Sequence, residues 1–388
     1  MKHKLLRLVL IACLSILDFV SSAQNISNIK CSMTSVEMLI KMMQFANNGI
    51  MPKDSDWEML FETDGYKTSF GIRSDAHEWK SQIRNAFETQ FAPLQKPTLD
   101  SIVAAQLTSS SPSEDFFIYN FYLARNKLDE YSTFFQNLDI NQLINESNAL
   151  ALNYLPKVAK SLSPNFGNLY FVLWDGEGRA WKNGIYIDFN LAFSEGEEEL
   201  MRIIAHELHH FYMSELLNNN YQNELTDYAL YAIIRNMIEG TADLISKPNM
   251  PIKHLGIYGD KFVKIYNDDY FNTPIVLAEM DKITCQYLAG EISIDQYSSV
   301  IACAHFEGHT TGGYMASLIR NQLGLDVAIN CCGDPAKFVC AYNDAAKRAN
   351  TYILSDKFIN HIISECNKMN LKSATIIQYT IKGRFMSR

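Results

Sequence analysis

One stretch of five residues, at 206–210, restricts the fold of this 388-residue chain more than any other. Two histidines, His206 and His210, stand four positions apart, and Glu207 follows directly after the first. If the backbone here is helical, side chains at this spacing lie one turn apart on the same face. On one helix face the two imidazoles can bind a single Zn²⁺ ion, with Glu207 beside them to accept a proton. The stretch therefore predicts a site for metal-assisted hydrolysis.

The surrounding residues support this helix. Ser194 followed by Glu197 fits a capping box, and the run of glutamates from 197 to 199 favours the positive end of a helix dipole. Apolar residues between Leu200 and Tyr212 recur at helical spacing. We therefore predict a helix over about 195–217, preceded by two strands over 168–174 and 185–189 with a Gly-rich turn between them.

A second acidic motif follows on a later segment. Residues 225–238 are largely apolar and predict a buried helix that continues into Glu239 and Asp243, one helical turn apart. A catalytic zinc held by two histidines needs a third protein ligand and one open position, and Glu239 can be that ligand. Asp243 can accept the free ring N–H of a ligating histidine and so fix its tautomer.

With both motifs the chain resembles the gluzincin metallopeptidases, which join HExxH on one helix to a glutamate ligand in an ExxxD motif on a later helix. His206, Glu207 and His210 match the first motif, and Glu239 and Asp243 match the second. The sequence of the second motif, residues 239–243, is most similar to that of predicted secreted zinc-dependent peptidase families of unknown substrate. The resemblance implies a zincin-like fold, one Zn²⁺ per chain and a peptide or protein substrate.

Hydrolysis also needs a donor that stabilises the developing oxyanion. The segment 303–314 brings together two histidines, a tyrosine and three glycines just before a helical run, 315–323. Gluzincins commonly supply a His or Tyr from the C-terminal lobe for this purpose, so the resemblance implies His309 or Tyr314. The residues alone also fit a Gly-rich turn with a helix-packing tyrosine.

The expected mechanism follows from these parts. Zinc lowers the pKa of a bound water and polarises the scissile carbonyl, while Glu207 takes the water proton and passes it to the leaving amine. Two alternatives stay open. His206 and His210 can be structural histidines, or the chain can be a non-catalytic secreted binding protein with a structural zinc site. The agreement of several independent cues argues against the first alternative, and retention of Glu207 argues against the second. His209 points about a third of a turn away from the metal face and is expected to pack rather than to bind metal.

The N-terminus predicts export. Residues 1–23 combine three basic residues, an apolar run and a small-residue cleavage site, which is typical of a signal peptide removed before Gln24. The alternative is a lipid anchor at Cys13, which ends a bacterial lipobox pattern, although the apolar run continues past it. The expected location is therefore secreted or periplasmic, and no later segment is long and apolar enough to span a bilayer.

Composition and patterning predict a predominantly helical α+β protein. Without the signal peptide the chain has 31 basic and 42 acidic residues, a net charge of −11, which argues against nucleic acid as a partner. We expect a helical N-terminal region over 24–165, a zincin-like core with a small sheet and a central metal-binding helix over 166–250, and a helical C-terminal lobe over 251–388. Six of the seven remaining cysteines lie in the last third, where export would permit disulfides.

Overall fold

The protein is seen in a computed structural model that describes residues 29–71, 76–91, 99–102, 104, 114–181, 183–220 and 227–371. The predicted signal peptide, residues 1–23, and Cys13 lie outside the described residues. None of the described helices is both long enough and apolar enough to cross a membrane.

A four-stranded sheet forms the base on which the site is built. Its strands are β1 (Cys31–Ser32), β2 (Asn168–Val172), β3 (Gly178–Trp181) and β4 (Gly184–Asp188), in the spatial order β1-β2-β4-β3. The first three in this order run parallel, and β3 pairs antiparallel with β4 at the edge. Every residue of β4 is buried, as expected for a strand covered on both faces. The two predicted strands are confirmed as β2 and β4, while β3 was not predicted.

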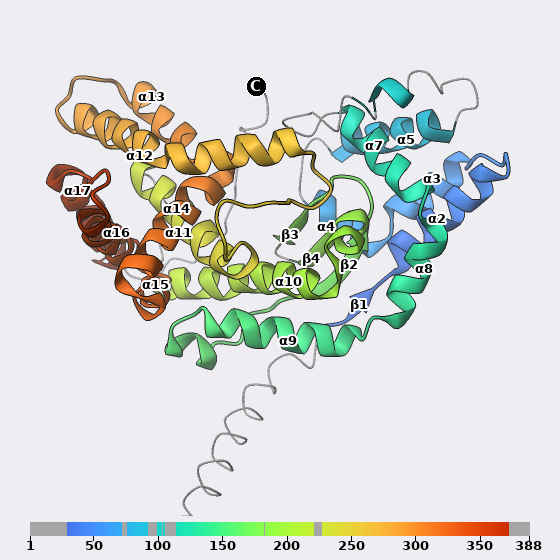
Figure 1. Ribbon diagram of the computed structural model, residues 1–388, viewed down its shortest axis with the longest axis horizontal. Coiled ribbons are helices and arrows are strands. Elements are labelled where there is room, and N and C mark those ends of the chain that lie inside the picture. The colour runs from blue at the N-terminus through green and yellow to red at the C-terminus, as the bar shows by residue number, and fades with distance from the viewer. Residues whose placement is uncertain are drawn as a thin grey trace, which may run out of the picture.

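Helix α10 (Phe189–Asn220) leaves the sheet directly after β4 and carries the 206–210 stretch. It is kinked at Gly196, where φ is 77° and ψ is 180°, a conformation that favours glycine. The predicted capping box is wrong, because the Ser194 hydroxyl donates to the carbonyl of Leu191 instead of capping the helix. The predicted helix itself is confirmed beyond this kink, and Figure 1 shows α10 crossing the middle of the molecule.

The N-terminal region is helical, as predicted. Its principal helices are α2 (Thr34–Asn47), α3 (Asp54–Phe61), α4 (Asp64–Phe70), α5 (Ala76–Phe91), α7 (Glu114–Arg125), α8 (Leu128–Asn137) and α9 (Ile140–Asn153). Helices α2 and α4 pack against β2, and α9 lies along α10. The sheet is therefore enclosed between the N-terminal helices and α10.

The rest of the chain is helical as well. Its elements are α11 (Tyr228–Ser246), α12 (Asp260–Leu288), α13 (Ile294–Tyr297), the 3₁₀ segments η3 (Ser298–Cys303) and η4 (His305–Gly308), α14 (His309–Leu323), α15 (Leu325–Asn330), α16 (Pro335–Ala349) and α17 (Asp356–Leu371). Ser355 caps α17, since its hydroxyl accepts the N–H of Phe358. Helices α12 to α17 lie mostly on the side of α10 opposite to α2–α8 (Figure 1).

A single large hydrophobic core extends through the described residues from Val36 to Met369 and joins the three predicted parts of the chain. The boundaries between these parts therefore stay a prediction. The disulfides that export would permit are not found: no disulfide joins the seven cysteines of the described residues. The fold is stabilised by packing. Helices α10 and α11, which carry the two sequence motifs, lie at its centre.

Candidate metal centre

The two histidines of the first motif share one face of α10, as the spacing requires. Their ring centroids are 4.6 Å apart, and the side chains of His206 and His210 are 6% and 18% exposed. Glu207 lies next to them and faces the edge strand β3, where its carboxylate accepts a hydrogen bond from the backbone N–H of Ala180. Burial raises the pKa of Glu207 to about 7. One helix therefore presents two imidazoles and an adjacent carboxyl group to the same space.

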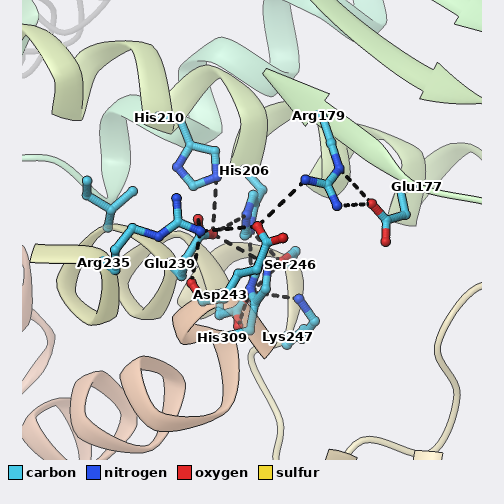
Figure 2. Close-up of polar contacts among 12 residues, drawn as sticks. Glu177, Arg179, His206, His210, Arg235, Glu239, Asp243, Ser246, Lys247 and His309 are labelled. Atoms are coloured by element: carbon cyan, nitrogen blue, oxygen red, sulfur yellow. Dashed lines mark hydrogen bonds and ion pairs between the residues drawn. The ribbon is translucent and has the colours of Figure 1, made fainter. Parts of the chain in front are cut away.

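Helix α11 brings Glu239 to these histidines. One carboxylate oxygen, Oε2, lies 3.6 Å from Nε2 of His206 and 3.3 Å from Nε2 of His210 (Figure 2). Both distances exceed the usual 2.7–3.2 Å of an N–H···O hydrogen bond. Two ligands on a tetrahedral Zn²⁺, each about 2.05 Å from the metal, are separated by about 3.3 Å. The spacing is therefore that of ligands around one zinc ion.

The burial of Glu239 supports the same interpretation. Its Oε2 atom is buried and lacks a hydrogen-bond partner among the described residues. Burial disfavours the ionised carboxylate, but His210 and His309 outweigh this effect and hold the pKa of Glu239 well below its ordinary value. An ionised, buried oxygen that faces two imidazole nitrogens and lacks a hydrogen bond fits a cation between them. The residues present therefore fit zinc.

Asp243, one turn further along α11, orients two imidazoles through their Nδ1 atoms. Its carboxylate lies 3.5 Å from Nδ1 of His206 and 3.1 Å from Nδ1 of His309. The hydroxyl of Ser246 also lies 2.9 Å from Nδ1 of His206. Because these groups engage Nδ1, the Nε2 atom of His206 is left to face Glu239. Burial lowers the pKa of His206 to about 4, which keeps the ring neutral and able to bind metal.

The chain matches a known family of proteins over most of this architecture. Residues 57–351, more than half of the chain, match the family described as "Putative zinc dependent peptidase (DUF5700)". The chain belongs to this family. The matched region includes both metal helices, α10 and α11. No curated protein and no solved structure matches the chain.

In this family member, His309 adjoins the candidate ligands from a third helix. It is the first residue of α14, and its Nε2 atom lies 3.5 Å from Oε2 of Glu239. Burial lowers the pKa of His309, but Asp243 and Glu239 outweigh it and raise the pKa above its ordinary value. His206, Asp243 and His309 also form a second group with metal-ligand spacing. Lys247 disfavours a cation there, since its ammonium lies 2.6 Å from Asp243.

Two other residues singled out in the sequence lie apart from the metal centre. The hydroxyl of Tyr314 lies 3.2 Å from that of Thr351, and its ring packs on Tyr270 at 5.4 Å, so the structure does not bring it to the zinc ligands. His209 is fully buried and belongs to neither group of potential ligands among the described residues. Its predicted packing position agrees with this placement.

Sequence reasoning missed several charged residues around the centre. Arg235 precedes Glu239 by one helical turn, and Lys247 follows Asp243 by one turn, so helical spacing could have revealed both. Arg179 and Glu307 were not recognisable in this way. They reach the centre from the edge strand β3 and from the turn η4. The segment 303–314 was noted for its histidines, tyrosine and glycines, and its pattern did not indicate a contact of Glu307 with Arg235.

Proposed function

We propose that this chain is an exported zinc metallopeptidase of the gluzincin type, in which His206, His210 and Glu239 hold the metal. The observation that carries this proposal is the position of Glu239 Oε2, buried without a hydrogen bond at 3.3–3.6 Å from two imidazole nitrogens. Family membership supports it independently. The zincin-like fold and the gluzincin mechanism are part of the proposal.

Bound zinc would supply Lewis-acid polarisation of the scissile carbonyl and acidification of a water molecule. Glu207, adjacent to the ligands on α10, accepts the proton of the attacking water and returns it to the leaving amine. The N–H of Ala180 fixes the orientation of this carboxylate. His309, held through Nδ1 by Asp243, presents its Nε2–H as the donor that stabilises the oxyanion.

The edge strand β3 supports a peptide as the substrate. It is the outermost strand on its side of the described sheet, and it lies beside Glu207 through Ala180. An extended peptide can add to such an edge through backbone hydrogen bonds. A substrate bound in this way would run past the metal centre, which favours a peptide bond over other amides.

The test compares the wild type with Glu207→Gln on a peptide library. We expect both proteins to bind about one zinc per chain, and only the wild type to cleave. The matched control is Glu198→Gln, a glutamate on the same helix whose side chain is 77% exposed, and it should cleave like the wild type. Equal cleavage by the wild type and Glu207→Gln would remove the catalytic proposal. Zinc binding without any cleavage by the wild type would favour a structural zinc site instead.

Export is tested separately. N-terminal sequencing of the protein recovered outside the cytoplasm should begin at Gln24 if the signal peptide is cleaved as proposed. A lipid-modified Cys13 at the N-terminus would show instead that the chain is membrane-anchored. An uncleaved Met1 would contradict both forms of the proposal.

A further inference from the structure

Two arginines from different elements converge on one carboxylate beside the metal centre. Arg179 extends from β3 and Arg235 from α11, and both reach the same oxygen of Glu307, Oε2, at 3.6 Å and 3.1 Å. Guanidinium groups bind carboxylates through paired N–H donors and suit this ligand better than lysine does. The two arginines therefore form a carboxylate-binding pair, and the side chain of Glu307 from the same chain occupies it.

This pair adjoins the zinc ligands. Nη2 of Arg235 lies 3.9 Å from Oε1 of Glu239, whose other oxygen faces His206 and His210. In the view of Figure 2, Arg179 and Arg235 extend toward the centre of the site from opposite sides. An extended peptide spans about 3.3–3.6 Å per residue. A carboxylate held by the two arginines would therefore lie within about one or two residues of the bond cleaved.

Glu307 can leave the arginines at small cost. Its side chain is 51% exposed, so water can solvate the carboxylate once it swings away. It lies on a turn of unfavourable conformation, with φ of 45° at Phe306 and 57° at Glu307. Such strain is concentrated at functional sites. The arginines also have contacts that do not involve the Glu307 side chain: Arg179 donates to Glu177 at 2.6 Å, and Arg235 donates to the backbone carbonyl of Glu307 at 3.2 Å.

The charges around the pair favour an incoming anion. Glu177 and Glu307 balance the two arginines, and the carboxylate of Glu239 is engaged when zinc binds. Departure of the Glu307 side chain leaves one unbalanced positive charge among Arg179, Arg235 and Glu177. A carboxylate from the substrate restores the balance and takes over the same donors.

We propose that Arg179 and Arg235 form a subsite for a carboxylate of the substrate, which Glu307 occupies in the free protein. This inference rests on the proposed function and narrows its substrate class. The peptides cleaved carry a carboxylate, either at the C-terminus or on an Asp or Glu side chain, within one or two residues of the scissile bond. Glu307 is an internal competitor for this subsite.

Three pools of random hexapeptides test the proposal. The first has a free C-terminal carboxylate and no acidic side chain, the second is identical but amidated, and the third is amidated with one Glu at varied positions. Two measurements are made on each pool: kcat/KM with zinc-loaded wild type, and binding to zinc-loaded Glu207→Gln protein. The first and third pools distinguish a C-terminal from a side-chain carboxylate.

We expect one carboxylate pool to exceed the amidated pool about tenfold in both measurements. Arg179→Gln should reduce this preference to about twofold or less, and Arg179→Lys should restore part of it. Glu307→Gln should act in the opposite direction and lower KM for the carboxylate pool about threefold, because the internal competitor is gone. Arg84→Gln is the control, because Arg84 lies on α5, far along the chain, and pairs with Asp54 and Glu88. This substitution should change neither the carboxylate preference nor KM.

The outcomes separate this inference from the proposed function. Equal cleavage of all three pools overturns the carboxylate subsite and leaves the peptidase intact. Selective binding of a carboxylate pool without cleavage by the wild type supports the subsite and contradicts the peptidase. Failure of every pool to bind contradicts the subsite. Loss of preference in both Arg179→Gln and Glu307→Gln would show that the ion pairs serve only to hold the turn, and this result also overturns the proposal.

Discussion

Asp243 supports the metal centre without being counted among the proposed zinc ligands. Its carboxylate faces Nδ1 of both His206 and His309, and it is itself paired with Lys247. Burial disfavours its ionised form, but Lys247 and His309 outweigh burial and keep its pKa below the ordinary value. A permanently ionised carboxylate in this position raises the basicity of the imidazole in front of it.

Asp243→Asn should therefore weaken zinc binding about 10- to 100-fold while leaving the fold intact. The matched control is Asp227→Asn, which alters a carboxylate on the cap of the same helix, α11. Isothermal titration with zinc measures both variants. Unchanged zinc affinity in Asp243→Asn would show that the carboxylate has no part in orienting the ligands.

The zinc-site residues could be predicted from sequence because each pair lies four residues apart on a helix. Geometry of this kind fixes a shared face without knowledge of the fold. The position of Tyr314 shows the limit of prediction from helical spacing. It follows His309 by five residues, which places it about 140° around α14, so the helix that presents one to the metal directs the other away.

At the scale of elements, the position of His309 depends on how closely α11 and α14 approach each other. A Cβ at Gly312 would overlap the backbone carbonyl of Asn236, and one at Gly240 would overlap the backbone of Gly312. Both helices therefore need glycine at their crossing. This contact places the first residue of α14 beside Glu239 and Asp243.

Gly312→Ala should destabilise the protein by more than about 2 kcal/mol, since backbone atoms cannot move aside as a side chain can. The next residue provides the control. A Cβ at Gly313 would meet Asp243 at an ordinary 3.6 Å, so Gly313→Ala should be neutral or stabilise by up to about 1 kcal/mol through helix propensity. Urea denaturation of both variants checks this, and equal effects would contradict the described helix crossing.

The residue that caps the start of α11 makes the free energy of unfolding depend on pH in the acid range. Asp227 caps the helix by accepting the N–H of Leu230, and it also accepts hydrogen bonds from His361 and Tyr297. Burial raises the pKa of Asp227, but these hydrogen bonds outweigh burial and bring the pKa below 3.8. The ionised carboxylate therefore contributes stability above about pH 3.8, and the contribution is lost as the pH falls through the lower pKa of the folded state.

Asp227→Asn should accordingly lower the free energy of unfolding by about 1 kcal/mol at pH 7. The difference from the wild type should shrink as the pH falls toward 3 and the wild-type carboxylate is protonated. Denaturant titrations across this range measure it. A difference that stays constant with pH would mean that the charge of Asp227 contributes nothing.

Helices and strands could be predicted where the apolar pattern was strong, and they could not be predicted where the pattern covered only a few residues. The N-terminal region was predicted to be helical, and β2 and β4 were predicted from their apolar runs. The edge strand β3 has only four residues, all half-buried, and contains Arg179, so its pattern resembles a turn. The η4 turn depends on left-handed residues other than glycine, which sequence patterns do not reveal.

At the scale of the whole molecule, the metal centre joins elements that are distant in sequence. The α10, α11 and α14 helices bring His206, Glu239 and His309 to face one another, between the N-terminal helices and the C-terminal ones. The α+β class with a small sheet followed from the sequence. The continuous core between the parts did not, because long-range packing has no local signal.

Removal of zinc should therefore lower the stability of the whole protein. A ligand that binds only the folded state at a thousand times its Kd contributes about 4 kcal/mol, and its loss lowers Tm by about 5 °C or more. Thermal denaturation with and without a chelator measures this. Glu239→Ala should melt at the same temperature in both conditions, and a chelator effect that persists in this variant would place the metal elsewhere.

The most direct test of the account is X-ray absorption at the zinc edge of the zinc-loaded protein. The account predicts one zinc with nitrogen and oxygen ligands at about 2.0–2.2 Å, including about two imidazoles, and loss of this spectrum in His206→Ala. The described residues also contain seven cysteines, which offer a different ligand set. Sulfur ligands at about 2.3 Å, or an unchanged spectrum in His206→Ala, would contradict the zinc site on α10 and α11.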